Sequence, residues 1–160
     1  MQEIEKYFTA QLRARRQAGL LRQLPAPAEG LSDFCSNDYL GLGRERFAAN
    51  LPAGGTGSRL ISGNSRAAEA LEQHIAAYHR APAALLFNSG YAANTGLVSC
   101  MATRHDTILY DELCHASIRE GLLLSRAKTF RFAHNDAEDL DKKLQRAQGR
   151  CFIVVESVYS

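Results

Sequence analysis

The residues of this sequence that could do chemistry lie where apolar segments stop. The segment AALLF ends at Phe87, and Asn88, Ser89 and Gly90 lead directly into the helix-forming residues YAANTGLVSCMA. A helix N-terminus leaves backbone N–H groups unpaired and carries a partial positive charge, and glycine lets a ligand approach the chain closely. Ser89 and Gly90 could therefore hold an anion such as a phosphate. A plain N-cap formed by Ser89 explains the same pattern.

His115 is the second candidate, because it follows the apolar segment TILYDE and opens the helix-like segment HASIREGLLLS. Its flat ring could stack on a planar ligand, although a histidine at such a place can also be structural. Asp111 and His115 do not make a convincing metal site or nucleophile pair, because no third ligand or positioned serine completes either one. Neither G-x-G-x-x-G nor G-x-x-x-x-G-K-[ST] occurs, so dinucleotide and P-loop sites lose their main support.

The elements that must position these residues alternate in type. We predict helices over 66–80, 91–102, 115–125 and 136–148, and strands over 83–88, 107–112, 128–133 and 151–157. Strands alternating with helices favour an α/β fold with a largely parallel sheet. Ligands of such folds bind at the carboxyl ends of the strands. The segments that begin at Ser89, Asp111 and Glu156 should therefore meet at one site.

The N-terminal part has a different pattern. Ile4, Phe8 and Leu12 recur at helical spacing and further leucines follow, which predicts an amphipathic helix over 3–24. The linker-like PAPAEG comes next, and the glycine-rich PAGGTGSRLISGN precedes the alternating region. We expect an N-terminal helix and loop segment over 1–50 and an α/β part over 51–160.

Composition restricts the classes of partner. The chain has 160 residues, 46% of them hydrophobic and 22% charged, with a net charge of +2 and no basic stripe, so we expect no nucleic-acid partner. No apolar run approaches about 20 residues and no signal peptide is evident, so we expect no membrane partner and a cytoplasmic location. The four cysteines lack a Cys-x-x-Cys pair, and we predict buried thiols at Cys35, Cys100, Cys114 and Cys151.

Five motifs taken together resemble the α-oxoamine synthases, pyridoxal-phosphate enzymes of fold type I. They are SNDYLGL at 36–42, GTGSRLISGN at 55–64, LLFNSGYAAN at 85–94, DELCHASI at 111–118 and VVESVYS at 154–160, in the family's order and near its spacing. The resemblance implies that 51–160 is the first part of an aspartate-aminotransferase-like large domain. It also implies pyridoxal 5'-phosphate as the cofactor and a homodimer whose sites form between subunits.

The resemblance assigns a role to each site residue. The cofactor phosphate would be held at Ser89, Gly90 and Tyr91. His115 would stack on the pyridine ring as a catalytic residue, with Glu156 and Ser160 beside the cofactor and Ser160 near its phenolic oxygen. Arg22 and Asn37 would bind substrate.

The reaction of this family condenses an amino acid with an acyl thioester and releases carbon dioxide. The SRLISGN motif most resembles the branch that joins L-alanine to a pimeloyl thioester, carried by coenzyme A or a carrier protein, in biotin synthesis. Branches that use other amino acids and acyl groups share much of the framework, so they remain alternatives.

The Schiff-base lysine of the family has no counterpart in this sequence. The four lysines present do not match it, namely Lys6, Lys128, Lys142 and Lys143. We predict these lysines on the first helix, at the far end of a strand and on a charged helix. The chain is therefore expected to be the N-terminal portion of a longer enzyme and inactive alone. A non-catalytic partner subunit is an alternative. A generic phosphate-binding domain explains the SGYAAN turn but not the other four motifs.

Overall fold

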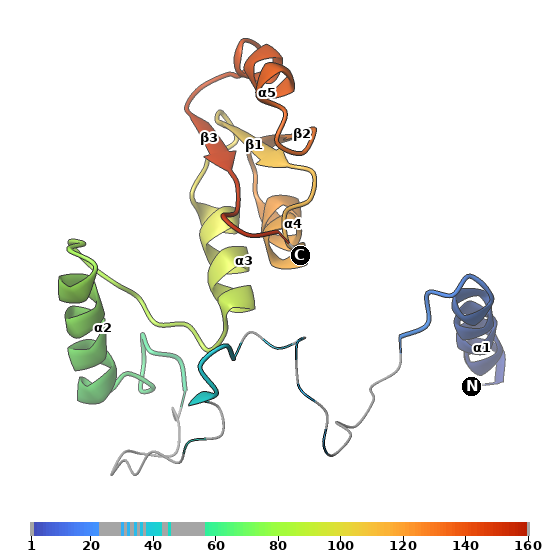
Figure 1. Cartoon of the computed structure of the whole chain (residues 1–160), viewed down its shortest axis with the longest axis horizontal. Helices are drawn as coiled ribbons and strands as arrows, with labels where there is room; N and C mark the ends of the chain where they lie inside the picture. The colour runs from blue at the N-terminus through green and yellow to red at the C-terminus, as the bar shows by residue number, and fades with distance from the viewer. Residues whose placement is uncertain are drawn as a thin grey trace. The chain divides into compact units, whose positions relative to one another are not determined.

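The computed structural model describes residues 2–22, 30, 32, 34, 36, 38–42, 45 and 57–159. It divides the chain into two units, Met1–Asn50 and Leu51–Ser160. The described helix of the first unit is α1, Gln2–Gln17, drawn in blue in Figure 1. Acidic side chains in its first turn and basic side chains in its last turn complement the helix dipole.

The end of α1 corrects the predicted helix over 3–24. Gly19 adopts a left-handed φ of 68°, and the N–H of Leu20 donates to the carbonyl of Arg15 at 2.8 Å. This Schellman arrangement satisfies a carbonyl of the last turn and terminates the helix. Leu20 and Leu21 continue the apolar composition but not the helix, which is why the prediction was too long.

The second unit contains α2 (Arg66–Tyr78), α3 (Gly90–Cys100), β1 (Thr107–Asp111), α4 (Ala116–Leu124), β2 (Lys128–Phe132), α5 (Ala137–Leu144) and β3 (Cys151–Val154). Its four helices begin at residues whose side chains accept a backbone N–H, namely Ser65, Ser89, His115 and Asp136. These caps satisfy donors that a helix start leaves free. The predicted positions of these helices and of three of the four strands are confirmed, with somewhat shorter elements.

The sheet has the strand order β2-β1-β3, and both pairings are parallel. Asp111 pairs with Phe132 and Tyr110 with Val154, so the three strands end at the same edge. β1 lies in the centre, and Thr107, Ile108 and Leu109 are buried. The predicted α/β class with a mainly parallel sheet is confirmed.

The predicted strand over 83–88 does not form. Within the described part of the chain this segment has no ladder partner, and its Leu86 N–H donates instead to Glu72 Oε1 at 2.7 Å. An apolar run can predict an extended backbone, but a strand also needs a neighbour to pair with.

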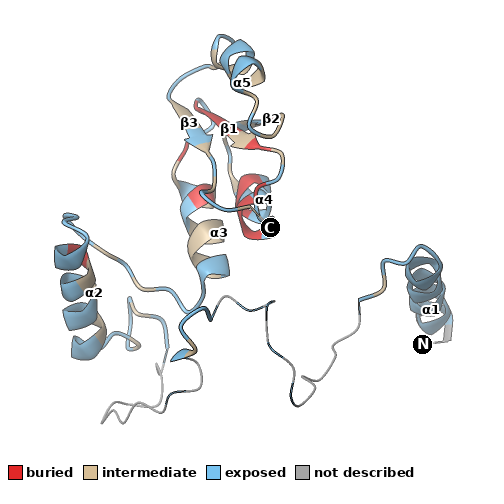
Figure 2. Cartoon of the chain, viewed as in Figure 1, coloured by how far each residue is buried: buried red, intermediate tan, exposed pale blue. Residues whose placement is uncertain are grey.

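The core of the second unit joins α3, β1 and α4. Val98, Ile108, Ile118 and Leu122 are buried together, and α3 and α4 pack against each other (Figures 1 and 2). Gly121 permits this close packing, because a Cβ at that position would lie 2.8 Å from Val98 Cβ. The helix pair thus holds the beginnings of α3 and α4 in a fixed relation.

The cysteines correct one further prediction. Cys114 is buried and its pKa is raised to about 11, first by burial and then by the charge of Glu156. Cys151 is partly buried, whereas Cys100 is exposed on α3, so the prediction of a buried thiol was wrong there. Cys35 lies outside the described residues. None of the described helices is both long and apolar enough to cross a membrane.

Candidate functional site

The candidate site lies at the carboxyl edge of the parallel sheet. His115 caps α4 just after β1, and Glu156 follows β3. The backbone N–H of His115 donates to Glu156 Oε2 at 2.7 Å. The structure therefore brings together two predicted site residues that are far apart in sequence.

The start of α3 forms the second part of the site. Ser89 Oγ accepts the N–H of Ala92 at 3.1 Å, so Ser89 is an N-cap. No acceptor is assigned to the N–H groups of Gly90 and Tyr91 among the described residues. A Cβ at Gly90 would meet no atom within 4 Å. The cap therefore leaves the N–H groups of Gly90 and Tyr91 open, because it uses the N–H of Ala92.

Tyr91 connects the starts of α3 and α4. Its ring lies edge-on to the His115 ring, with centroids 6.1 Å apart and an interplanar angle of 79°. Its hydroxyl donates to Glu120 of α4, and this hydrogen bond raises the pKa of Tyr91, with a further contribution from burial. His115 as a whole is an exposed residue.

A cluster that the sequence did not predict lies at the same edge. Asp111 is buried, and its carboxylate accepts hydrogen bonds from the N–H groups of Leu113 and Asn135 and from His134 Nδ1, the last at 3.0 Å. Burial raises the Asp111 pKa, but these donors outweigh it and the net pKa is lowered. The His134 ring packs edge-on against Tyr159, with centroids 4.6 Å apart.

This cluster supports the candidate site because the Tyr159 hydroxyl accepts the N–H of Glu156 at 3.0 Å. Asp111 and His134 thus hold the segment that carries Glu156. His134 follows β2 just as Asp111 ends β1, and this shared position was the signal in the sequence that could have identified the pair.

The glycine-rich segment is held by an ion pair. Arg59 donates to Glu72 of α2 at 2.5 and 3.0 Å and to Asn64 Oδ1 at 2.8 Å. Glu72 also accepts the N–H of Leu86, shortly before Ser89. The loop that contains Arg59 and the segment entering α3 therefore share one carboxylate.

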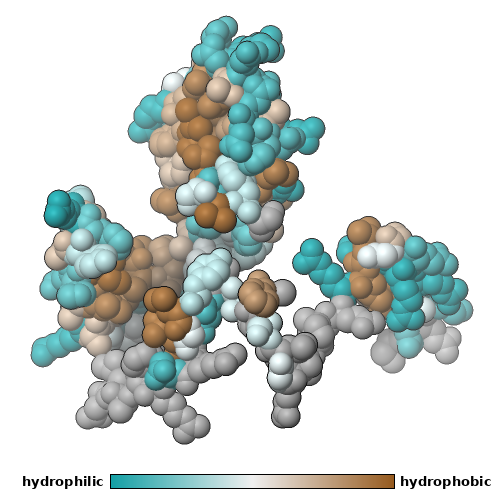
Figure 3. All heavy atoms as spheres, viewed as in Figure 1, coloured by the Kyte–Doolittle hydropathy of each residue, from teal (hydrophilic) through white to brown (hydrophobic). Residues whose placement is uncertain are grey.

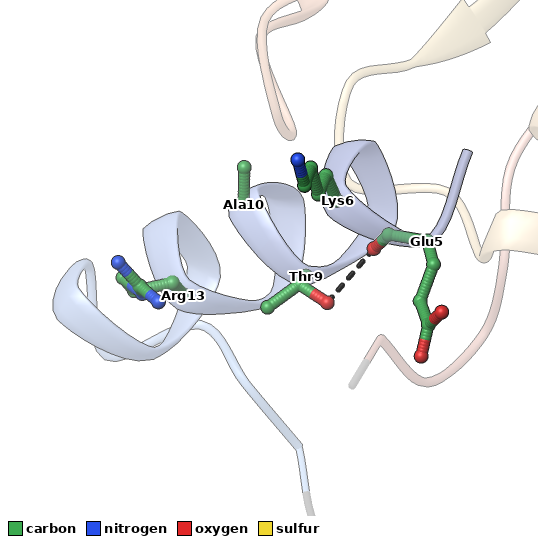
Figure 4. Close-up of a pocket in the computed structure, with 5 residues that line it drawn as sticks. All are labelled: Glu5, Lys6, Thr9, Ala10 and Arg13. Carbon is green, nitrogen blue, oxygen red and sulfur yellow. Dashed lines mark hydrogen bonds between the residues drawn. The ribbon is translucent and has the colours of Figure 1, made fainter. Parts of the chain in front are cut away.

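Three further predicted site residues lie in the first unit or outside the described residues. Arg22 lies in the first unit, in the coil after α1, and its side chain is exposed. Asn37 and Ser160 lie outside the described residues. A hollow along α1 is lined by Glu5, Lys6, Thr9, Ala10 and Arg13 (Figure 4). It contains none of the predicted site residues.

Comparison with known proteins agrees with the motifs. The model of the family "Aminotransferase class I and II" matches residues 29–160. An 8-amino-7-oxononanoate synthase from Marinobacter nauticus is 39% identical over 96% of this chain, which spans 44% of that protein. One from Emericella nidulans is 42% identical over 93% of this chain and 42% of its own length. The chain thus spans less than half of the length of these curated relatives.

Two solved structures extend the likeness to the fold. The serine palmitoyltransferase from Sphingomonas wittichii has a TM-score of 0.64 and 39% identity, over 67% of this chain and 27% of its own. The 8-amino-7-oxononanoate synthase from Francisella tularensis has a TM-score of 0.63 and 29% identity, over 82% of this chain and 38% of its own. Serine palmitoyltransferase structures that contain pyridoxal phosphate show similar values.

Proposed function

Because the chain belongs to the aminotransferase class I and II family, we propose that the protein carrying it is a pyridoxal-phosphate-dependent α-oxoamine synthase. The reaction supported best is the condensation of L-alanine with a pimeloyl thioester, with loss of carbon dioxide, to 8-amino-7-oxononanoate. The names of the curated relatives support this choice of product. We expect a homodimer, as the family resemblance implies.

The observation that carries the proposal is the joint presentation of an open helix start and an exposed histidine ring. The ring centroid of Tyr91 lies 6.1 Å from that of His115, and among the described residues no acceptor is assigned to the N–H groups of Gly90 and Tyr91. A phosphate fits the helix start because that end is electropositive and lined with donors. A planar heteroaromatic ring fits His115. The described residues therefore suit pyridoxal phosphate.

Each residue has a positioning task in this arrangement. The turn at Gly90 and Tyr91 would anchor the phosphate, and His115 would fix the plane of the cofactor ring. Glu156 would hold the His115 backbone through its 2.7 Å hydrogen bond. When bound, the cofactor supplies the electron sink for the substrate α-carbon, and the protein supplies orientation and electrostatics. Arg22 and Asn37 are proposed to bind substrate, and Ser160 to lie near the phenolic oxygen of the cofactor.

We expect none of the four lysines of this chain to supply the amine that would bind the cofactor covalently. Lys128 begins β2, at the sheet edge opposite the site, and its Nζ donates to Gln148 at 2.7 Å. Lys143 pairs with Asp139 on α5, where Lys142 is exposed, and Lys6 lies on α1. Borohydride reduction of the 160-residue polypeptide with pyridoxal phosphate should therefore label no single lysine stoichiometrically. Stoichiometric labelling of one of them would contradict this assignment.

The function is tested by product analysis of the natural protein that carries the chain. Incubation with pyridoxal phosphate, L-alanine and pimeloyl-coenzyme A should release carbon dioxide and yield a product with the mass of 8-amino-7-oxononanoate. The variant His115→Ala should lose most turnover and alter the cofactor spectrum, with little change in stability. Normal turnover and a normal spectrum in this variant would overturn the role of His115.

A second reaction is worth testing because serine palmitoyltransferase from Sphingomonas wittichii is similar in fold at 39% identity. The same assay with L-serine and palmitoyl-coenzyme A separates the two. Turnover with this pair alone would replace the first proposal. Product from neither pair would leave the family membership intact but exclude both reactions.

A further inference from the structure

The Nδ1 atom of the His115 ring is hydrogen-bonded to a buried serine. Ser117 is fully buried at the start of α4, and its backbone N–H donates to His115 Nδ1 at 3.2 Å. Its hydroxyl Oγ lies 2.8 Å from the same ring nitrogen. Asn94, on the facing helix α3, donates its amide Nδ2 to Ser117 Oγ at 3.1 Å. A hydrogen-bonded line thus runs from α3 through Ser117 to the ring.

The direction of each hydrogen bond follows from the donors. A backbone N–H can only donate, so Nδ1 must present its lone pair to Ser117. The Asn94 amide nitrogen is likewise only a donor, so Ser117 Oγ accepts from it and directs its own proton to Nδ1. Because Nδ1 accepts both the N–H and the hydroxyl proton of Ser117, it carries no proton itself. The neutral His115 ring therefore carries its proton on Nε2.

We propose that Asn94 and Ser117 are positioning residues that fix His115 as the tautomer with its proton on Nε2. They also set the orientation of the ring, because both hydrogen bonds from Ser117 act on Nδ1 and Asn94 holds the Ser117 hydroxyl. The consequence for catalysis rests on the proposed function, in which the face of this ring holds the cofactor. The choice of tautomer itself requires no cofactor.

The other groups near His115 do not determine the tautomer of its ring. Glu156, after β3, accepts the backbone N–H of His115 and not a ring nitrogen. The Tyr91 ring of α3 packs edge-on against the His115 ring, and the Tyr91 hydroxyl donates its hydrogen bond to Glu120 of α4. Among the described residues, Ser117 is therefore the only assigned hydrogen-bond partner of the His115 ring.

The hydrogen-bonded relay from Asn94 through Ser117 to His115 depends on the contact between α3 and α4. Gly121 lets the helices approach, because a Cβ added there would lie 2.8 Å from Val98 Cβ and 3.1 Å from the Thr95 carbonyl oxygen. Thr95 Oγ1 donates to the Ser117 carbonyl at 3.0 Å. Thr95 thus helps to join the helices without contacting the serine hydroxyl, which makes it a matched control for the relay.

The test is the ¹⁵N NMR spectrum of the His115 imidazole in the natural protein that carries the chain. It is recorded without cofactor, at a pH where the ring is neutral, and assigned by comparison with His115→Gln. In the unsubstituted protein Nε2 should carry the proton. Ser117→Ala and Asn94→Leu should each shift the tautomer ratio toward Nδ1–H, by up to about tenfold for the loss of one hydrogen bond. The control Thr95→Val should leave the ratio unchanged.

The proposal is overturned if Nδ1 carries the proton in the unsubstituted protein, or if Ser117→Ala and Asn94→Leu change the ratio no more than Thr95→Val. If Ser117→Ala does not fold, Asn94→Leu decides, because Asn94 is only partly buried. A fall in kcat with an unchanged cofactor dissociation constant in Asn94→Leu supports the positioning role, and an unchanged kcat overturns it. Failure of the proposed function is a separate result, since the unsubstituted protein would then form no product whatever its tautomer.

Discussion

The helices α1 and α4 have similar apolar spacing but opposite environments. On α1, Ile4, Phe8 and Leu12 are 64%, 59% and 55% exposed, and the residues of this helix whose burial is described are pale blue in Figure 2. Its hydrophobic side chains are visible at the surface in Figure 3. On α4, Ile118 and Leu122 are 5% and 6% exposed and belong to the core. Of these two helices, α4 has packing partners among the described residues of its own unit, whereas none is described for α1.

The predicted site residues divide along the same line. His115 and Glu156 are fixed by contacts between segments remote in sequence, whereas Arg22 lies exposed in the coil after α1. Long-range packing therefore defines the geometry of the proposed cofactor site. We expect substitutions around α4 to affect folding strongly, and equivalent substitutions on α1 to have little effect in the 160-residue polypeptide.

The largest difference should come from truncating one leucine on each helix. Leu122→Ala in α4 should lower the free energy of unfolding by about 2–5 kcal/mol, because it removes core contacts and leaves a cavity. Leu12→Ala in α1 should change it by less than about 0.5 kcal/mol, because this side chain is exposed. Urea unfolding followed by circular dichroism measures both. Equal losses would show that the exposed face of α1 is covered in solution.

A smaller effect is expected from removing one carboxylate in each region. Asp111→Ala leaves the N–H groups of Leu113 and Asn135 without their buried acceptor, and should cost about 3 kcal/mol of unfolding free energy. Glu5→Ala, in the exposed first turn of α1, should cost no more than about 0.5 kcal/mol. Thermal unfolding of the two variants gives the difference. A cost below about 1 kcal/mol for Asp111→Ala would mean that the cluster is not formed.

Two glycines separate tertiary from local effects. Gly121→Ala should destabilise the second unit by about 1–3 kcal/mol, because its Cβ would overlap Val98. Gly19→Ala should cost about 1–2 kcal/mol through left-handed backbone strain, but only at the end of α1. Hydrogen exchange can locate each effect. Faster exchange in α3 and α4 for Gly19→Ala would contradict the separation.

The smallest effect concerns the ion pair between Arg59 and Glu72. The hydrogen bond from Arg59, followed by that from the Leu86 N–H, lowers the pKa of Glu72 from 4.5 to about 2. A lowered pKa means that the stabilising contribution is present above pH 4.5 and is lost as the pH falls toward 2. In the folded protein the Leu86 amide resonance should therefore titrate with a midpoint near pH 2, and this titration should be absent in Glu72→Gln. A titration of this resonance centred near pH 4.5, the ordinary value, would refute the ion pair.

Most of the second unit could be predicted from the sequence because its signals are local. Apolar periodicity and capping residues such as Ser89 and Asp136 mark the helices, and the buried run at Thr107–Asp111 marks the central strand. The strand over 83–88 was wrongly predicted because pairing depends on a neighbour. The predicted end of the first helix was wrong, although the signal for the true end, Gly19 followed by an apolar residue, was present in the sequence.

The site was predictable only in outline. Strand ends and motif resemblance identified His115 and Glu156, but not the partners that fix them. Asp111 and His134 meet across two adjacent strands, and Asn94 meets Ser117 across two packed helices. Such pairs depend on register and helix approach, which one sequence does not reveal.

The most direct test of the central claim is a crystal structure of the natural protein with pyridoxal phosphate. The account predicts phosphate oxygens within hydrogen-bonding distance of the Gly90 and Tyr91 N–H groups. It also predicts that the cofactor ring lies face to face with His115, at a contact distance of about 3.5–4 Å. A phosphate bound elsewhere, or a cofactor ring that does not touch His115, would contradict the assignment of this sheet edge as the cofactor site.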